Sequence, residues 1–185
     1  MKKIISFIGA GNVAWHLTEA FQNAGFQLGE IYSRKIENAN LLCKKLGSLG
    51  KIKAQNHLNF TDSQSEIFIL SIADSAYENV LKQIQLPDKA ILLHTSGSLP
   101  LESLQKVSSN IAVFYPLQTF SKAKKVNFQQ IPFCLEANSD FVGETVHNLA
   151  KCLSSKIYFL NSKERAVLHV AAVFACNFGN HLWNN

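Results

Sequence analysis

Two glycines near the N-terminus have the spacing of a phosphate-binding turn. Gly9 and Gly11 lie in Gly9–Ala14, between the apolar run Lys3–Ile8 and an amphipathic segment. The first glycine permits a tight turn, the second lets a pyrophosphate approach the backbone, and a small residue such as Ala14 keeps the following helix close to the sheet. That helix offers free N–H groups and the positive end of its dipole. This context favours a dinucleotide site over a turn without a ligand. The residues expected to contact the dinucleotide here are Gly9, Ala10, Gly11, Asn12 and Val13.

The residues that follow the second predicted strand indicate which dinucleotide binds. An NAD site usually has Asp or Glu about 20 residues past the first glycine, where it accepts hydrogen bonds from the ribose. This chain has Ser33, Arg34 and Lys35 there, and the competing acid Glu30 comes too early in the strand. Arg34 can fork onto a 2′-phosphate or stack on adenine, while Ser33 and Lys35 add a donor and a charge. The alternative is that Arg34 and Lys35 are only a basic loop and do not recognise a phosphate. The sequence favours NADP over NAD.

Polar segments also follow two later predicted strands. Ligands of open parallel sheets bind outside the carboxyl ends of the strands, so Ser71–Asp74 is expected near the ribose and nicotinamide and His94–Ser98 on the substrate side. Asp74 is interpreted as a helix cap rather than as a reacting group. For His94, a satisfied core histidine and a reacting group both remain open. The residues of these segments assigned to cofactor binding are Ser71, Ile72, Ala73 and Ser96.

Two further segments supply candidates for substrate binding and proton transfer. Tyr115–Ser121 is a polar loop flanked by aromatics, which either covers the pocket or is a packed proline turn; Gln118 and Thr119 are its substrate-binding candidates. On the apolar last segment, His169 and Asn177 are costly to bury without partners. They either face the cleft as acid and substrate anchor or bond across a helix or subunit interface. The candidate reacting residues are His169, His94 and Asn177, and no metal site is predicted.

The hydrophobic pattern alternates between strands and helices. The predicted strands are Lys3–Ile8, Phe26–Ser33, a short one near Ile52–Ala54, Glu66–Ile72, Lys89–Thr95, Ile111–Tyr115, Ile131–Ala137 and Lys156–Leu160. The predicted helices are Asn12–Ala24, Ile36–Leu46, Ser75–Gln85, Pro100–Val107, Asp140–Leu153 and Lys163–Trp183. This alternation predicts an α/β Rossmann fold with a doubly wound, mostly parallel sheet.

The last predicted helix divides the chain into two expected parts. Residues 1–161 are expected to form the NADP-binding Rossmann domain. Residues 162–185 are expected to be the first helix of an all-helical domain that is truncated or incompletely present. A helix this apolar cannot stand alone in water, so it must pack on another domain or subunit. The expected assembly is a homodimer formed through this region.

Composition narrows the class of protein. The chain has 185 residues, 47% of them hydrophobic and 17% charged, with a formal net charge of +5. Its lysines are scattered and not interleaved with aromatics, which argues against a nucleic-acid partner. The apolar run after Lys2 and Lys3 is too short for a signal peptide, and none is long enough to span a membrane. Four widely spaced cysteines indicate a reducing, cytoplasmic compartment.

Five segments together resemble a known family. The chain looks like two-domain Rossmann proteins with a C-terminal domain of unknown function, similar to pyrroline-5-carboxylate reductase, deazaflavin-dependent NADP oxidoreductase and the 6-phosphogluconate dehydrogenase superfamily. The segments are Phe7–Ala14, Tyr32–Arg34, His94–Ser98, Phe114–Ser121 and Leu168–Phe178. The resemblance implies an NADP domain followed by an all-helical domain that often dimerises and closes the cleft. Related hydroxyacid dehydrogenases use a Lys and an Asn one turn apart; His169 and Val173 have that spacing here, so that pair is absent.

The leading hypothesis is therefore an NADP(H)-dependent oxidoreductase that transfers hydride to or from a small polar metabolite. Its alternative is a non-catalytic NADP-binding sensor or scaffold that dimerises through its C-terminal helix. A deazaflavin-linked hydride exchanger is a third possibility.

Overall fold

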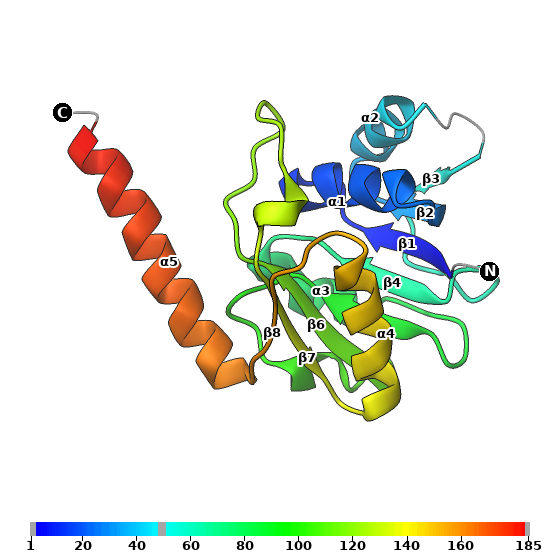
Figure 1. Cartoon of the computed structure of the whole chain (residues 1–185). Helices are drawn as coiled ribbons and strands as arrows, with labels where there is room; N and C mark the ends of the chain where they lie inside the picture. The colour runs from blue at the N-terminus through cyan, green and yellow to red at the C-terminus, as the bar shows by residue number, and fades with distance from the viewer. Residues whose placement is uncertain (1–2, 48–50, 184–185) are drawn as a thin grey trace.

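The sheet has the strand order of a Rossmann fold (Figure 1). The computed structural model describes residues 3–47 and 51–183, and side chains as far as residue 175. Within these residues, eight strands form one sheet in the order β3-β2-β1-β4-β5-β6-β7-β8. The strands are β1 Ile4–Ile8, β2 Gln27–Tyr32, β3 Lys53–Gln55, β4 Ile67–Leu70, β5 Ile91–His94, β6 Asn110–Pro116, β7 Phe133–Ala137 and β8 Ile157–Phe159. Neighbours pair in parallel except β6 and β7, which confirms the predicted fold class.

Helices cover both faces of the sheet. The α-helices are α1 Asn12–Asn23, α2 Ile36–Lys45, α3 Tyr77–Leu81, α4 Asp140–Lys151 and α5 Ser162–Trp183; the 3-10 helices are η1 Asp74–Ala76, η2 Leu101–Leu104 and η3 Phe128–Gln130. Strand β4 shows the division between the two layers of core. Ile67 and Ile69 belong to one buried cluster with residues of α1, α2 and α4. Phe68 and Leu70 belong to the other, with residues of α3 and η2. A strand buried on both faces needs the continuous apolar sequence found here.

Strand β6 extends farther than its parallel neighbour at the edge where Rossmann ligands bind. Leu70, His94, Val113 and Glu136 stand in one row across β4, β5, β6 and β7. Strand β5 ends at this row, whereas β6 continues to Pro116, paired with β7. Tyr115 therefore lies beyond the end of β5, at the carboxyl edge of the parallel strands.

The region after β4 differs from the sequence prediction. The predicted helix over residues 75–85 is replaced by η1 and the short helix α3. Gln85 accounts for its early end: the N–H of Gln85 donates to the carbonyl of Leu58 at 2.9 Å, and its own carbonyl accepts from Phe60 at 2.8 Å. These bonds hold Gln85 in an extended bridge with Asn59, so the helix cannot continue to that residue.

Helix α5 extends away from the rest of the structure (Figure 1). Val167 is 71% exposed and Phe174 is 64% exposed, and Val170 is also exposed. These side chains form an apolar surface on the helix.

Within the described residues, no helix combines the length and the hydropathy that crossing a bilayer requires.

Candidate functional site

A cavity of about 760 Å³ lies at the carboxyl ends of β1, β4 and β5. It is large enough for much of a dinucleotide, since ligand cavities commonly measure about 300 to 1,000 Å³. Its lining comes from loops that are far apart in the chain. The lining residues are Gly9–Val13, Tyr32–Arg34, Asn38, Ser71–Ala76, Asn79, Val80, Thr95–Gly97, Tyr115, Lys122 and His169.

The turn between β1 and α1 leaves room for phosphates. Gly9 has a φ of +122°, and a Cβ there would lie 2.2 Å from the carbonyl oxygen of Ser71. Only glycine fits that position. At Gly11, by contrast, a Cβ would find no protein atom closer than the same oxygen at 3.8 Å. Gly11 is the N-cap of α1, no side chain caps this helix, and its first turn holds no acid. The open backbone and uncapped helix end therefore fit a pyrophosphate.

Ser33 and Arg34 lie at the end of β2, where a 2′-phosphate would be recognised. Ser33 is buried and Arg34 is exposed, and both line the cavity together with Asn38, which the sequence analysis did not identify. Lys35 is the N-cap residue of α2 and does not line the cavity. The group assigned from sequence is therefore reduced to Ser33 and Arg34, with Asn38 added.

Glu30, the acid that could have served an NAD site, is hydrogen-bonded to serines outside the cavity. The Glu30 carboxylate accepts hydrogen bonds from the hydroxyls of Ser6, Ser63 and Ser65, at 2.5, 2.7 and 3.2 Å. Glu30 does not line the cavity. This arrangement leaves the ribose position at the end of β2 without the carboxylate that an NAD site usually has.

Internal hydrogen bonds hold the loops after β4 and β5 in place. Ser71, Ile72, Ala73 and Ser96 all line the cavity, as the sequence analysis expected of cofactor-binding residues. The Thr95 hydroxyl donates to the carbonyl of Leu70 at 3.2 Å. The Ser96 hydroxyl accepts from the backbone N–H groups of residues 98 and 99, each at 3.2 Å. The bottom of the cavity is therefore preorganised by the protein itself.

Asp74 connects these two loops and is not a helix cap. Its carboxylate accepts a hydrogen bond from the Ser98 hydroxyl at 2.6 Å. The N-cap residue of η1 is Ala73, and no side-chain cap bond forms there. The predicted capping role is thus wrong: the carboxylate joins the loop after β4 to the loop after β5.

His169 and Tyr115 form a polar pair on the cavity. The Tyr115 hydroxyl lies 2.8 Å from His169 Nδ1, with the rings 5.6 Å apart at 78°. A Cβ on Gly97 would lie 2.6 Å from both Cγ and Nδ1 of His169. The imidazole therefore occupies the space that the side chain of any other residue at position 97 would need. When Tyr115 donates to Nδ1, the neutral ring carries its proton on Nε2. The pair can therefore exchange a proton with a group in the cavity.

A buried ion pair fixes the beginning of α5. Arg165 is fully buried and pairs with Glu136 of β7, and its guanidinium also donates to the Leu99 carbonyl. The Ser162 hydroxyl donates to the same carboxylate at 2.8 Å. Arg165 lies one turn before His169, so this network positions the histidine over the loop after β5. Arg165 has no role predicted from the sequence, although an arginine in the first turn of an apolar helix is a usable signal.

His94 is a core residue. It is fully buried, its Nδ1 accepts a hydrogen bond from the Ser96 N–H at 3.2 Å, and it does not line the cavity. Burial lowers the pKa of His94 to about 3, and the positive charge of Arg165 acts in the same direction. A neutral, enclosed imidazole has no access to a ligand in the cavity. The assignment of His94 as a reacting group is therefore corrected: it is a core histidine, although its Nε2 finds no hydrogen-bond partner among the described residues.

Two other sequence candidates do not line the described cavity. Gln118 and Thr119 are exposed, do not line it, and bond to each other through the Gln118 side chain and the Thr119 N–H at 3.0 Å. Asn177 lies in α5, but its side chain is outside the described residues. The structure adds Tyr115 and Lys122, which the sequence analysis did not assign to the site.

Comparison with known families decides the classification. Residues 4–96 match the family model described as NADP oxidoreductase coenzyme F420-dependent. The chain belongs to this NADP oxidoreductase family. Residues 131–185 match a domain of unknown function, DUF2520, which here extends from the beginning of β7 into α5. The resemblance stated from the sequence is confirmed: the chain is a member of a pyridine nucleotide-binding oxidoreductase family.

Solved structures similar to this family member agree with that assignment. A candidate NADP oxidoreductase from Bacteroides fragilis is 35% identical, with a TM-score of 0.89 over 99% of this chain and 70% of its own. A protein from Thermotoga maritima is 27% identical, with a TM-score of 0.76 over 96% of this chain and 66% of its own. The 1-pyrroline-5-carboxylate reductase of Streptococcus pyogenes shares the fold, at 20% identity and a TM-score of 0.68 over 88% of this chain and 60% of its own. The search of curated proteins found no relative.

Proposed function

We propose that this chain binds NADP(H) and forms the cofactor-binding part of an oxidoreductase that acts on a small polar metabolite. The observation that carries the proposal is the cavity that joins the open turn at Gly11 with Ser33 and Arg34. Arg34 takes part in no ion pair among the described residues, so its charge is available to a 2′-phosphate. The carboxylate that would favour NAD is held by three serine hydroxyls elsewhere.

The reaction assigned to this site is hydride transfer coupled to proton transfer. The nicotinamide, when bound, supplies or accepts the hydride. The chain positions the dinucleotide along the carboxyl edge of the sheet, and the loops after β4 and β5 exclude water below it. The pair of Tyr115 and His169 lies on the same cavity. We assign His169 as the general acid during reduction: its imidazolium form donates the Nε2 proton to the substrate and becomes the neutral ring, while its Nδ1–H donates to the Tyr115 hydroxyl, which holds the ring.

The choice of cofactor is tested by the variant Arg34→Ala. We expect its dissociation constant for NADPH to rise at least about tenfold, the effect of one lost charge-assisted contact, while that for NADH changes little. Lys35→Ala is the matched control, since Lys35 is the adjacent cation and does not line the cavity. Calorimetric titration of both cofactors measures the effect. Equal weakening of NADPH and NADH by Arg34→Ala would contradict the assignment of NADP.

The reaction is tested by turnover. A panel of carbonyl, imine and hydroxy-acid substrates with NADPH or NADP⁺ is followed by the absorbance of the reduced nicotinamide. For the best substrate class, His169→Gln should lower kcat by about 100-fold, the usual scale of general acid catalysis, and leave NADPH affinity unchanged. Tyr115→Phe keeps the ring and should lower kcat by a smaller factor. A His169→Gln variant with the wild-type kcat would remove the histidine from the mechanism.

The second candidate function is a non-catalytic NADP sensor or scaffold, favoured by the exposed apolar side chains of α5. Tight NADPH binding without turnover of any member of the panel would support it over the enzyme. In both cases we propose that a second copy of the chain covers Val170 and Phe174. Light scattering measures the mass in solution, and Phe174→Asp should convert a dimer to a monomer. A monomeric wild-type chain would contradict this assembly.

A further inference from the structure

The cavity contains a second cation without a protein counter-charge. Lys122 and Arg34 both line it, and among the described residues neither side chain takes part in an ion pair or a hydrogen bond. Among the described residues, Asp74 is the one acidic residue that lines the cavity, and its carboxylate already accepts a hydrogen bond from Ser98. Lys122 lies on the loop between β6 and η3, far in sequence from the glycine turn. A lysine ammonium at a cavity wall is well suited to bind an anion.

Two contacts hold the loop that carries Lys122 against α1. His16 Nε2 lies 2.9 Å from the carbonyl oxygen of Ser121, the residue before Lys122. The His16 ring also packs on Phe120, with the centroids 5.7 Å apart. These contacts place Lys122 beside the helix whose N-terminus faces the cavity.

Trp15 then fixes the Lys122 side chain. The Lys122 ammonium lies 4.7 Å from the centroid of the Trp15 ring, within the range of a cation–π contact. The backbone N–H of Trp15 donates to the Gly11 carbonyl at 2.9 Å, so Trp15 lies one helical turn after the phosphate-binding glycine.

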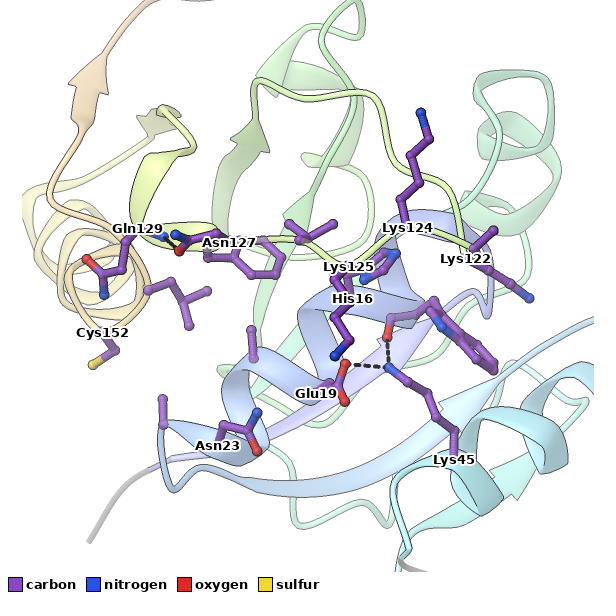
Figure 2. A pocket seen from close by; sticks show the side chains of 17 residues that line it. His16, Glu19, Asn23, Lys45, Lys122, Lys124, Lys125, Asn127, Gln129 and Cys152 are labelled. Atoms are coloured by element: carbon purple, nitrogen blue, oxygen red, sulfur yellow. Dashed lines mark hydrogen bonds and ion pairs between the residues drawn. The ribbon is translucent and has the colours of Figure 1, made fainter.

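Lys45 makes a similar ring contact but is already neutralised. Its ammonium lies 4.9 Å from the Trp15 ring centroid, and it bonds to the Glu19 carboxylate and the Trp15 carbonyl, each at 2.7 Å. Figure 2 shows Lys45 bonded to Glu19, with Lys122 and Lys124 pointing away from this pair in different directions. Lys122 is thus distinguished from its neighbours: it lines the dinucleotide cavity, and its charge has no carboxylate partner there.

We propose that Lys122 binds the pyrophosphate of the cofactor from the loop side, opposite the amides of the glycine turn, and that Trp15 is its positioning residue. This inference rests on the proposed function, because it concerns the same dinucleotide. The pyrophosphate would then be held by uncapped N–H groups from α1 and by one ammonium from the loop after β6. The contact with Trp15 of α1 assigns Lys122 to the pyrophosphate, and the 2′-phosphate is left to Arg34, which follows β2.

The experiment compares Lys122→Met with Lys124→Met in the 185-residue chain. Dissociation constants for NADPH, NADH and 2′-AMP are measured by calorimetry at low and at high salt. Lys122→Met should weaken NADPH and NADH by the same factor, about tenfold at low salt, and should leave 2′-AMP unchanged because 2′-AMP has no pyrophosphate. Lys124→Met should stay within about twofold of wild type. The difference between Lys122→Met and wild type should shrink at high salt.

The variant Trp15→Leu tests the positioning role. It keeps the charge of Lys122 but removes the ring, so both dinucleotides should weaken by the same factor, which should be smaller than for Lys122→Met. Thermal unfolding of each variant shows that it is folded. The proposal fails if Lys122→Met binds like Lys124→Met, or if it weakens NADPH alone. A wild-type chain that binds neither dinucleotide overturns the proposed function as well, whereas tight wild-type binding unaffected by Lys122→Met overturns only this inference.

Discussion

Replacing Gly97 by alanine tests whether the loop after β5 positions His169. The new Cβ would lie 2.6 Å from two atoms of the imidazole, whereas ordinary contacts begin at about 3.4 Å. The ring must therefore move by about 0.8 Å, enough to take a 2.8 Å contact with Tyr115 out of hydrogen-bond range. Because Arg165 anchors the beginning of α5, the helix cannot simply move away. Overpacking and the lost hydrogen bond together should lower the free energy of unfolding by about 2 kcal/mol.

Urea unfolding measures this loss, and Gly143→Ala is the matched control. Gly143 lies inside α4, and its Cβ would meet the nearest side chain at an ordinary 3.8 Å. Alanine is the better helix former by about 1 kcal/mol, so the same substitution should stabilise the chain there. The two glycine variants are therefore expected to shift the unfolding midpoint in opposite directions.

A double-mutant cycle then identifies the contact that is lost. Tyr115→Phe should cost about 1 kcal/mol of unfolding free energy in the wild-type background and almost nothing in Gly97→Ala, where the hydrogen bond is already broken. Equal costs in both backgrounds, together with an unchanged midpoint for Gly97→Ala, would refute the described packing of His169.

Three further predictions concern stability and binding. Glu136→Gln leaves the buried charge of Arg165 unpaired and should cost about 3 kcal/mol in urea unfolding; a loss below about 1 kcal/mol would contradict the described ion pair. Gly9→Ala places a Cβ 2.2 Å from the Ser71 carbonyl oxygen and should abolish NADPH binding in calorimetry, so wild-type affinity would disprove the tight turn. The pKa of His94 is about 3 in the folded chain and 6.5 ordinarily, so the unfolded state takes up a proton between these values. Stability should therefore fall as the pH drops below about 6.5, and His94→Gln should show a smaller loss in urea unfolding over that range; an unchanged pH dependence would contradict the burial of His94.

The fold could be predicted from the sequence because local patterns carry it. The apolar run before Gly9 and the amphipathic segment after it specify the first strand, turn and helix without help from the rest of the chain. Continuous apolar runs such as Ile67–Leu70 are typical of strands buried on both faces. The prediction failed at residues 75–85, where a bridge between Asn59 and Gln85 overrides the local helical pattern. No pattern within that segment reveals a partner that comes from an earlier loop.

The candidate site, too, was predicted only where its residues lie close together in the sequence. The phosphate-binding turn and the pair of Ser33 and Arg34 were predicted because their chemistry is contained in short segments. The contact of Tyr115 with His169 was not, because 54 positions separate the two residues, and the sheet register and the buried pair of Arg165 and Glu136 together bring them into contact. His94 was left open between two roles, since burial decides between them and one sequence does not give burial. Lys122 was not assigned because its ring partner Trp15 comes from the first helix.

The segment between Tyr115 and His169 contains β7, α4 and β8, so the two ends of the candidate proton relay come from opposite sides of one folding unit. The glycine turn and the arginine after β2 precede that unit, and their backbone geometry does not involve it. A nascent chain that has formed only its first six strands would therefore already present a place for a nucleotide, while the imidazole and the phenol would not yet be neighbours. Assembly of the last two strands thus controls when a nucleotide-binding domain acquires the groups for chemistry.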